Sequence, residues 1–133
     1  MRDATVGKGT ITKVLPGTSA SNTTDAIDLG GDGPFRPEEI TVEVSVPAIA
    51  AHVTTGNNLV IALWHAATTT LAAPVAPVPA ITITIPGVAS TGSVASVWRF
   101  KLPIGTLRYI GFRQTCGGTD DLSGSTITYS ILT

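Results

Sequence analysis

The chain has 133 residues, a formal net charge of −1 and a single cysteine, Cys116. This length suits one domain with its own core, and one cysteine excludes an intrachain disulfide. The near-zero charge gives no bulk attraction to nucleic acid or to an anionic membrane, and we predict neither as a partner. Charged residues make up only 13% of the chain. Because interface cores are depleted in charge, we expect other subunits to cover part of the surface; the alternative is a surface coated with Thr and Ser.

The first residues are rich in Gly, Thr and Ser, and only the stretch GTITKVL alternates, with Ile11 and Val14 as its apolar positions. We predict an extended N-terminal arm over residues 1–24, with at most one edge strand, followed by a β-domain over residues 25–133. The start lacks the apolar segment of a signal peptide, so we expect synthesis in the cytoplasm. Prolines, threonines and a histidine interrupt the longest apolar stretch, so no membrane-spanning helix is expected.

From residue 26 onward, apolar and polar residues alternate with a period of two, which is typical of half-buried strands. These strands are predicted at about residues 26–29, 40–46, 59–65, 81–85, 96–102, 107–115 and 125–132. The Pro/Ala-rich residues 66–80 read as a linker, because proline is excluded from central strands. Seven or eight short strands without helical periodicity predict an all-β, two-sheet, jelly-roll-like sandwich.

No reactive constellation stands out. His52 and His65 lack metal-binding spacing, and Cys116, in TCGGTDD, matches no catalytic cysteine signature. The adjacent acids Asp120 and Asp121 lie beside turn residues, where carboxylates usually serve only to solvate a loop. No G-x-S-x-G, Walker or dinucleotide pattern occurs. We therefore predict no enzymatic activity, no cofactor and no metal.

Half of the chain's eight Arg and Lys residues lie in RFKLPIGTLRYIGFRQT, residues 99–115; they are Arg99, Lys101, Arg108 and Arg113. If the two strands of this stretch pair as a hairpin, the cations gather on one sheet; if consecutive strands cross between sheets, the cations separate. Two interpretations stand. The cations form a docking patch for an acidic protein surface, since Arg grips carboxylates, or they only solubilise the sheet. Trp98 and Phe100, on the face of their strand opposite Arg99 and Lys101, are expected in the core. Trp64 is a candidate for either the core or a subunit contact.

The order of these elements, together with RFKLPIGTLRYI at residues 99–110 and DLG at residues 28–30, resembles the small jelly-roll capsid cement (decoration) proteins of tailed bacteriophages. The resemblance covers roughly residues 20–133, and the Pro/Ala stretch and the loop at residues 30–39 depart from it. Its motifs are structural rather than catalytic.

The resemblance implies a homo-oligomer, a dimer or trimer, bound on the virion to the outside of an assembled capsid. It would cement neighbouring copies of the phage major capsid protein against the pressure of packed DNA. The candidate capsid or subunit contacts are Arg99, Lys101, Arg108, Arg113 and Trp64. One alternative is a carbohydrate- or receptor-binding phage module, which needs exposed aromatic rings such as Trp64 and Tyr129. Another is a cupin-like metalloenzyme, which needs His52 or His65 beside carboxylates.

Overall fold

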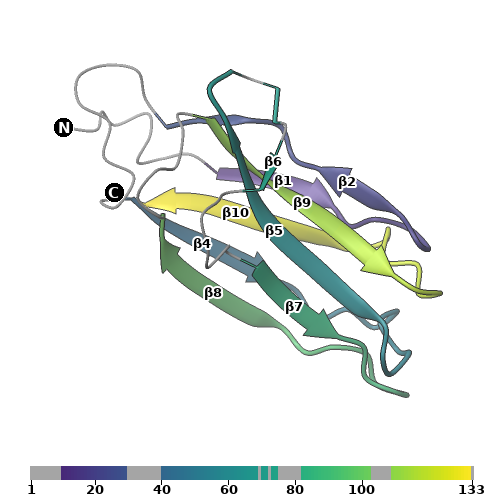
Figure 1. The fold of residues 1–133 in the computed structure, drawn as a ribbon. Coiled ribbons are helices and arrows are strands. Elements are labelled where there is room, and N and C mark those ends of the chain that lie inside the picture. The colour runs from purple at the N-terminus through teal and green to yellow at the C-terminus, as the bar shows by residue number, and fades with distance from the viewer. Residues whose placement is uncertain are drawn as a thin grey trace.

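The structure is a computed structural model that describes residues 10–29, 40–68, 70–71, 73–74, 82–102 and 109–132. Within these residues it contains ten strands in two antiparallel sheets, packed face to face (Figure 1). The four-stranded sheet has the order β1 (Thr10–Val14), β10 (Thr126–Leu132), β4 (Thr41–Val46) and β8 (Ser96–Lys101). The described residues form no helix that could span a membrane. The predicted all-β, two-sheet sandwich is confirmed.

The six-stranded sheet is built around two long neighbours, β5 (Asn58–Ala66) and β9 (Tyr109–Gly117). The outer side of β9 pairs with β2 (Ser21–Thr23) and β3 (Ile27–Asp28), and the outer side of β5 pairs with β7 (Thr82–Pro86) and β6 (Ala73–Pro74). Strands β2 and β6 were not predicted. Both are only two or three residues long, which is too short for an alternating pattern to show.

The strands pair in a nested order along the chain. Strand β1 pairs with β10, β2 and β3 pair with β9, β4 pairs with β8, and β5 pairs with β7. This is the order of one long hairpin rolled over itself, with further pairing of β10 to β4 and of β5 to β9. Consecutive strands β8, β9 and β10 consequently alternate between the two sheets.

The core lies between the inner faces of the two sheets. In β4, Val42, Val44 and Val46 are buried and their neighbours in the strand are half-buried, as the alternating sequence predicts. Each such aliphatic side chain stabilises the fold by about 1.5–3 kcal/mol relative to leaving it in water. At the centre, the ring of Phe112 on β9 stacks on that of Tyr129 on β10, with ring centroids 4.2 Å apart. Because these strands belong to different sheets, the stack joins the two layers.

Residues 10–24 are part of the sandwich, although the sequence placed residues 1–24 in an extended arm; residues 1–9 lie outside the described residues. Strand β1 is an edge strand, β2 joins the other sheet, and Leu15 is buried in the core. The buried amide of Gln114 donates from its Nε2 to the carbonyl oxygen of Val14 (3.0 Å) and to Asn22 Oδ1 (2.7 Å). One core side chain therefore ties both N-terminal strands to β9.

Candidate functional site

The four candidate cations do not form one patch. Arg99 and Lys101 lie on β8 of the four-stranded sheet, whereas Arg113 lies on β9 of the six-stranded sheet. The strands at 96–101 and 109–117 do not pair, so the hairpin considered above is not formed. Arg108 lies outside the described residues. The three described cations thus split between two faces of the molecule.

Arg99 forms an ion pair on the outer face of the four-stranded sheet. Its Nε donates to Glu43 Oε2 at 2.6 Å, and the two residues stand directly opposite each other on β8 and β4. The Arg99 side chain is 67% exposed, and exposed pairs of this kind contribute only about 0.2–1 kcal/mol. Lys101 stands opposite Thr41 and has no ion pair with any described residue. Both cations remain accessible to a partner.

Trp64 lies half-buried on the outer face of the six-stranded sheet. The Arg113 guanidinium carbon lies 5.2 Å from the centroid of its ring, a cation–π distance, and Arg113 Nη1 donates to Thr23 Oγ1 at 3.3 Å. The ring face is therefore covered from within the chain. Trp64 is neither in the core nor a freely presented aromatic side chain.

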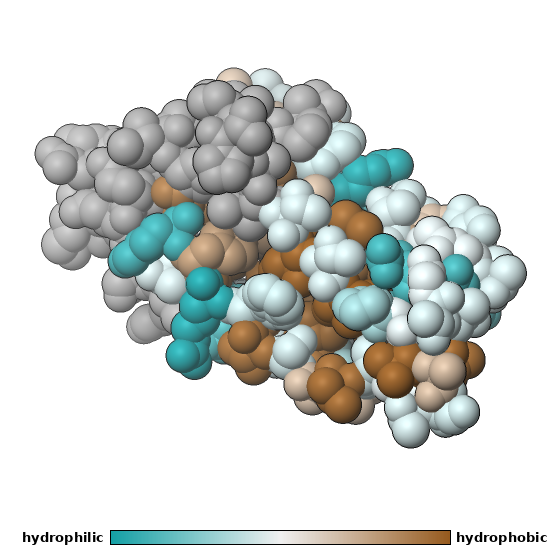
Figure 2. All heavy atoms as spheres, turned by 60° about the horizontal axis from the view of Figure 1, so that its bottom comes forward, coloured by the Kyte–Doolittle hydropathy of each residue, from teal (hydrophilic) through white to brown (hydrophobic). Residues whose placement is uncertain are grey.

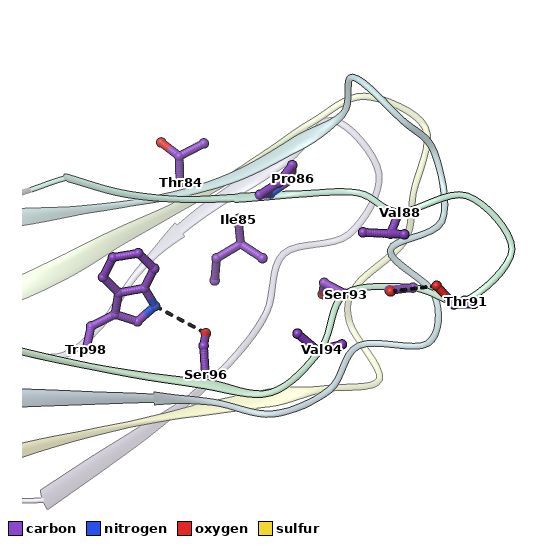
Figure 3. A pocket seen from close by; sticks show the side chains of 10 residues that line it. Thr84, Ile85, Pro86, Val88, Thr91, Ser93, Val94, Ser96 and Trp98 are labelled. Atoms are coloured by element: carbon purple, nitrogen blue, oxygen red, sulfur yellow. Dashed lines mark hydrogen bonds between the residues drawn. The ribbon is translucent and has the colours of Figure 1, made fainter.

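An apolar pocket of about 250 Å³ lies between the edge strands of the two sheets, β7 and β8. Strand β7 is at the edge of one sheet and β8 at the edge of the other, and Ile85, Val88, Val94 and Trp98 contribute to the lining. Figure 3 shows Trp98 reaching from β8 toward Ile85 on β7. Apolar side chains also come to the surface between polar ones in Figure 2, where the bottom of Figure 1 faces the viewer.

Trp98 corrects a sequence-based assignment. Its strand pattern places it on the inner face, opposite Val44, and from this pattern it was expected in the core. The side chain is instead 41% exposed, because no described strand continues the sheet beyond β8. Its indole nitrogen donates to Ser96 Oγ at 3.2 Å. No sequence pattern indicated the pocket, because Val88 and Val94 lie in the stretch VASTGSVAS, where apolar residues do not alternate regularly.

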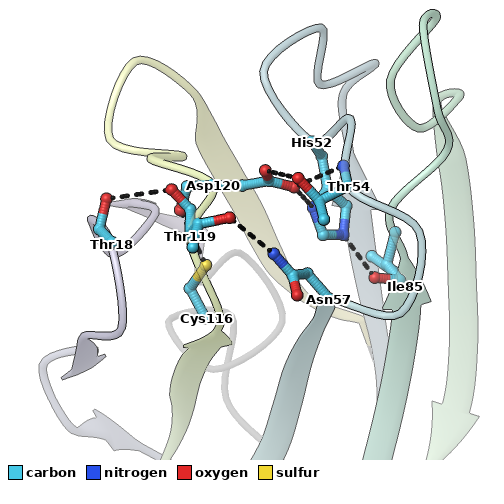
Figure 4. Close-up of polar contacts among 8 residues, drawn as sticks. All are labelled: Thr18, His52, Thr54, Asn57, Ile85, Cys116, Thr119 and Asp120. Carbon is cyan, nitrogen blue, oxygen red and sulfur yellow. Dashed lines mark hydrogen bonds and ion pairs between the residues drawn. The ribbon is translucent and has the colours of Figure 1, made fainter.

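A buried polar cluster lies at the same end of the sandwich (Figure 4). It joins the loop that carries His52 and Thr54 to the loop that carries Asp120 and to strand β7. His52 is fully buried; its Nδ1 lies 3.2 Å from Asp120 Oδ2 and its Nε2 lies 2.7 Å from the carbonyl oxygen of Ile85. A carbonyl oxygen and an ionised carboxylate only accept hydrogen bonds. Both partners of the ring are thus acceptors, and the ring donates to both of them only when each of its nitrogens carries a proton.

Hydrogen bonds hold the pKa of Asp120 below its ordinary value. The largest contribution comes from Thr54, whose Oγ1 donates to Asp120 Oδ1 at 2.6 Å and whose backbone N–H donates to Oδ2 at 3.0 Å. His52 lowers the pKa of Asp120 further. Asp121 shows a lowered pKa as well, because the hydroxyl and N–H of Ser123 donate to it.

These lowered pKa values predict a loss of stability in acid. Between the lowered folded pKa and the unfolded value of about 3.9, the unfolded chain binds more protons than the folded one. The free energy of unfolding should therefore be highest above pH ~4 and fall as the pH decreases through the folded pKa. Urea denaturation at a series of acidic pH values measures this slope. Asp120→Asn should make it shallower, and an unchanged slope would show that Asp120 does not titrate in this way.

Neither the polar cluster around His52 nor Cys116 forms a metal site with other described residues. The described part of the chain contains no group of three or more His, Cys, Asp or Glu side chains placed to hold a metal ion. Cys116 is buried, its thiol donates to the carbonyl oxygen of Asp120 at 3.1 Å, and burial, with the nearby Asp120 charge, raises its pKa. A raised pKa keeps the thiol protonated, and the thiolate is the reactive form.

Comparison with known proteins adds no assignment. No model of a known protein family matches the chain, and no curated protein matches it. The candidate site therefore consists of features read from the fold itself: the pocket, the free edge of β8 and the cations on that strand.

Proposed function

We propose that the chain is a structural virion protein that binds the outer surface of an assembled phage capsid and cements neighbouring major capsid subunits. The observation that carries this proposal is the gathering of exposed apolar side chains near the β8 edge. Val88, Val94 and Trp98 line the pocket and are 41% or more exposed, with Val94 at 78%. Val97 adds an exposed apolar side chain on the outer face of β8. A grouped apolar surface on a soluble protein typically marks a site of protein contact.

The fold and the sequence add to this support. The nested strand pairing is the arrangement expected of a jelly roll, the fold of the phage proteins that residues 99–110 resemble. Small hydroxyl side chains dominate the outer face of the four-stranded sheet, including Thr12, Thr41 and Thr128. Apart from Glu43, Arg99 and Lys101, the strand residues of this face carry no charge that would have to be desolvated when copies of the chain or a capsid cover it.

The mechanism is physical rather than chemical. A protein that binds only the assembled, expanded lattice stabilises that lattice through its binding free energy. Many copies, each bridging adjacent subunits, act together, because dissociation of a subunit must break several contacts at once. In this role the chain works outside the shell, as a dimer or trimer, and needs no cofactor.

The test uses shells assembled from the major capsid protein encoded in the same genome. The purified chain should co-sediment with expanded shells, saturate at a fixed ratio, and raise the temperature at which they rupture. Unexpanded shells are the control and should bind less. Absence of binding to expanded shells, at concentrations where the chain is folded, would refute the proposal.

The alternative of a carbohydrate- or receptor-binding module must use a different surface from the one first considered. Tyr129 is buried and Arg113 covers the ring of Trp64, so these two residues do not form an exposed aromatic platform. Trp98 is the large aromatic side chain that the described residues expose. Quenching of tryptophan fluorescence by simple sugars would favour this alternative.

A further inference from the structure

The outer edge of β8 presents a regular row of backbone groups that pair with no described strand. Leu102 N donates to the carbonyl oxygen of Ile40 at 3.1 Å, and hydrogen-bonded pairs recur at every second residue of an antiparallel ladder. In β8, Trp98 and Phe100 therefore direct their backbone groups toward β4, whereas Val97, Arg99 and Lys101 direct theirs to the other side. No described strand lies on that side.

This edge lacks several devices that usually block pairing between strands. The β8 sequence SVWRFK contains no proline, and its register against β4 is continuous, without a bulge. Free edges of this kind are templates for an added strand. In such additions the backbone supplies affinity, and pockets for alternate side chains supply specificity.

The pocket lies where an added strand would place one set of its side chains. Alternate residues of a strand point to opposite faces, so residues level with Trp98 and Phe100 would point toward the inner side, over the apolar pocket. The wall there also carries Ser93 Oγ, a buried hydroxyl with no hydrogen-bond partner among the described residues. An apolar side chain of the added strand would cover the exposed faces of Trp98 and Val94.

The other set of side chains would meet the cations. Residues level with Arg99 and Lys101 would share the outer face with these two exposed side chains. Arg99 retains 67% exposure beside Glu43, and opposite charges directly across a strand pair are favourable. The complementary sequence is thus apolar and acidic in alternation.

We propose that the β8 edge and its pocket bind an extended segment of the major capsid protein, in which apolar and acidic side chains alternate, as an added strand of the four-stranded sheet. This inference rests on the proposed function and names the contact through which the chain would hold the shell. The added strand continues the sheet beyond Val97, Arg99 and Lys101 and closes the pocket beside Trp98.

Amide hydrogen exchange on the full chain tests the backbone part. In the free protein, the amides of Trp98 and Phe100 should exchange slowly, and those of Val97, Arg99 and Lys101 should exchange fast. After binding to expanded shells, the last three should become slow as well. If they stay fast while the chain is bound, docking uses another surface and the inference is wrong.

Two variants test the same edge by affinity. Val97→Pro removes one outward N–H that the β4–β8 ladder does not use, and it should weaken shell binding about tenfold or more; Val97→Thr keeps that N–H and is the matched control.

The second variant tests the cation. Lys101→Glu should weaken shell binding more than Lys101→Gln. Lys13→Glu, on β1 at the opposite edge of the sheet, controls for net charge. If Val97→Pro does not fold, Lys101→Glu and the exchange pattern decide.

The outcomes separate this inference from the proposed function. Wild-type binding with unaffected variants leaves the capsid role standing and removes the β8 edge from it. Absence of wild-type binding removes both. If the three outward amides are already slow in the free protein and become fast on dilution, the edge pairs with a second copy of the chain, which overturns the proposal of a capsid segment.

Discussion

Phe112→Ala is expected to lower the free energy of unfolding by about 3–5 kcal/mol, the range for truncating a buried aromatic side chain. Phe112 is 1% exposed and touches both layers, because its ring stacks on Tyr129 and meets Phe100 edge-on with centroids 6.5 Å apart. The cavity left behind would lie between two sheets that the surrounding buried side chains hold apart, so it cannot readily collapse. Urea denaturation followed by circular dichroism measures the loss.

Phe112→Leu is the matched control for this prediction. It fills most of the volume and removes the aromatic stack, so its expected cost is about 1–2 kcal/mol. A loss below about 1 kcal/mol for Phe112→Ala would mean that the stack does not join the two sheets as described.

His52→Leu is expected to lower the free energy of unfolding by about 3 kcal/mol, because each buried acceptor left without a hydrogen-bond donor costs about 1–3 kcal/mol. The replacement removes the ring contacts to the Asp120 carboxylate and to the Ile85 carbonyl oxygen. The cost is not larger because Thr54 still donates twice to Asp120. Denaturant unfolding near pH 7 measures it.

Two further measurements test this role of the ring. His52→Gln keeps a hydrogen-bond donor, so its cost should be smaller than that of His52→Leu. Nitrogen chemical shifts of the wild-type His52 ring report which of its two nitrogens carry a proton. Two variants with nearly wild-type stability would contradict the contribution of these hydrogen bonds.

The sequence predicted those elements of the fold that local patterns determine. The residues EITVEVSV alternate over a full strand, and β4 buries the predicted side chains. The pairing of β8 with β4, rather than with the next strand in the chain, could not be predicted. Nothing in residues 96–115 distinguishes a hairpin from two strands in separate sheets, because the choice depends on partners more than 50 residues away, such as Glu43 for Arg99.

The sequence predicted one part of the candidate site, the strand that carries Arg99 and Lys101, and not the pocket beside it. Arg99 and Lys101 were correctly placed in a strand, but the separation of Arg113 onto the other sheet follows from topology alone. The sequence predicts Trp98 in the core because strand periodicity indicates the face of the sheet on which a side chain lies. It does not indicate whether the strand lies at the edge of the sheet, where such a side chain stays exposed. The pairing of His52 with Asp120 spans 68 residues, and no local motif announces it.

The nested order of the strands also has a consequence for how the polypeptide acquires its shape. Thr10 stands opposite Ser130, and the four-stranded layer places β10 between β1 and β4. During translation, β1 cannot pair until nearly the whole polypeptide has been synthesised, because its partner β10 is the last strand in the chain. Topologies dominated by such distant partners have high contact order and usually fold over milliseconds to seconds, so maturation of this protein should be post-translational and slow beside that of a helical bundle.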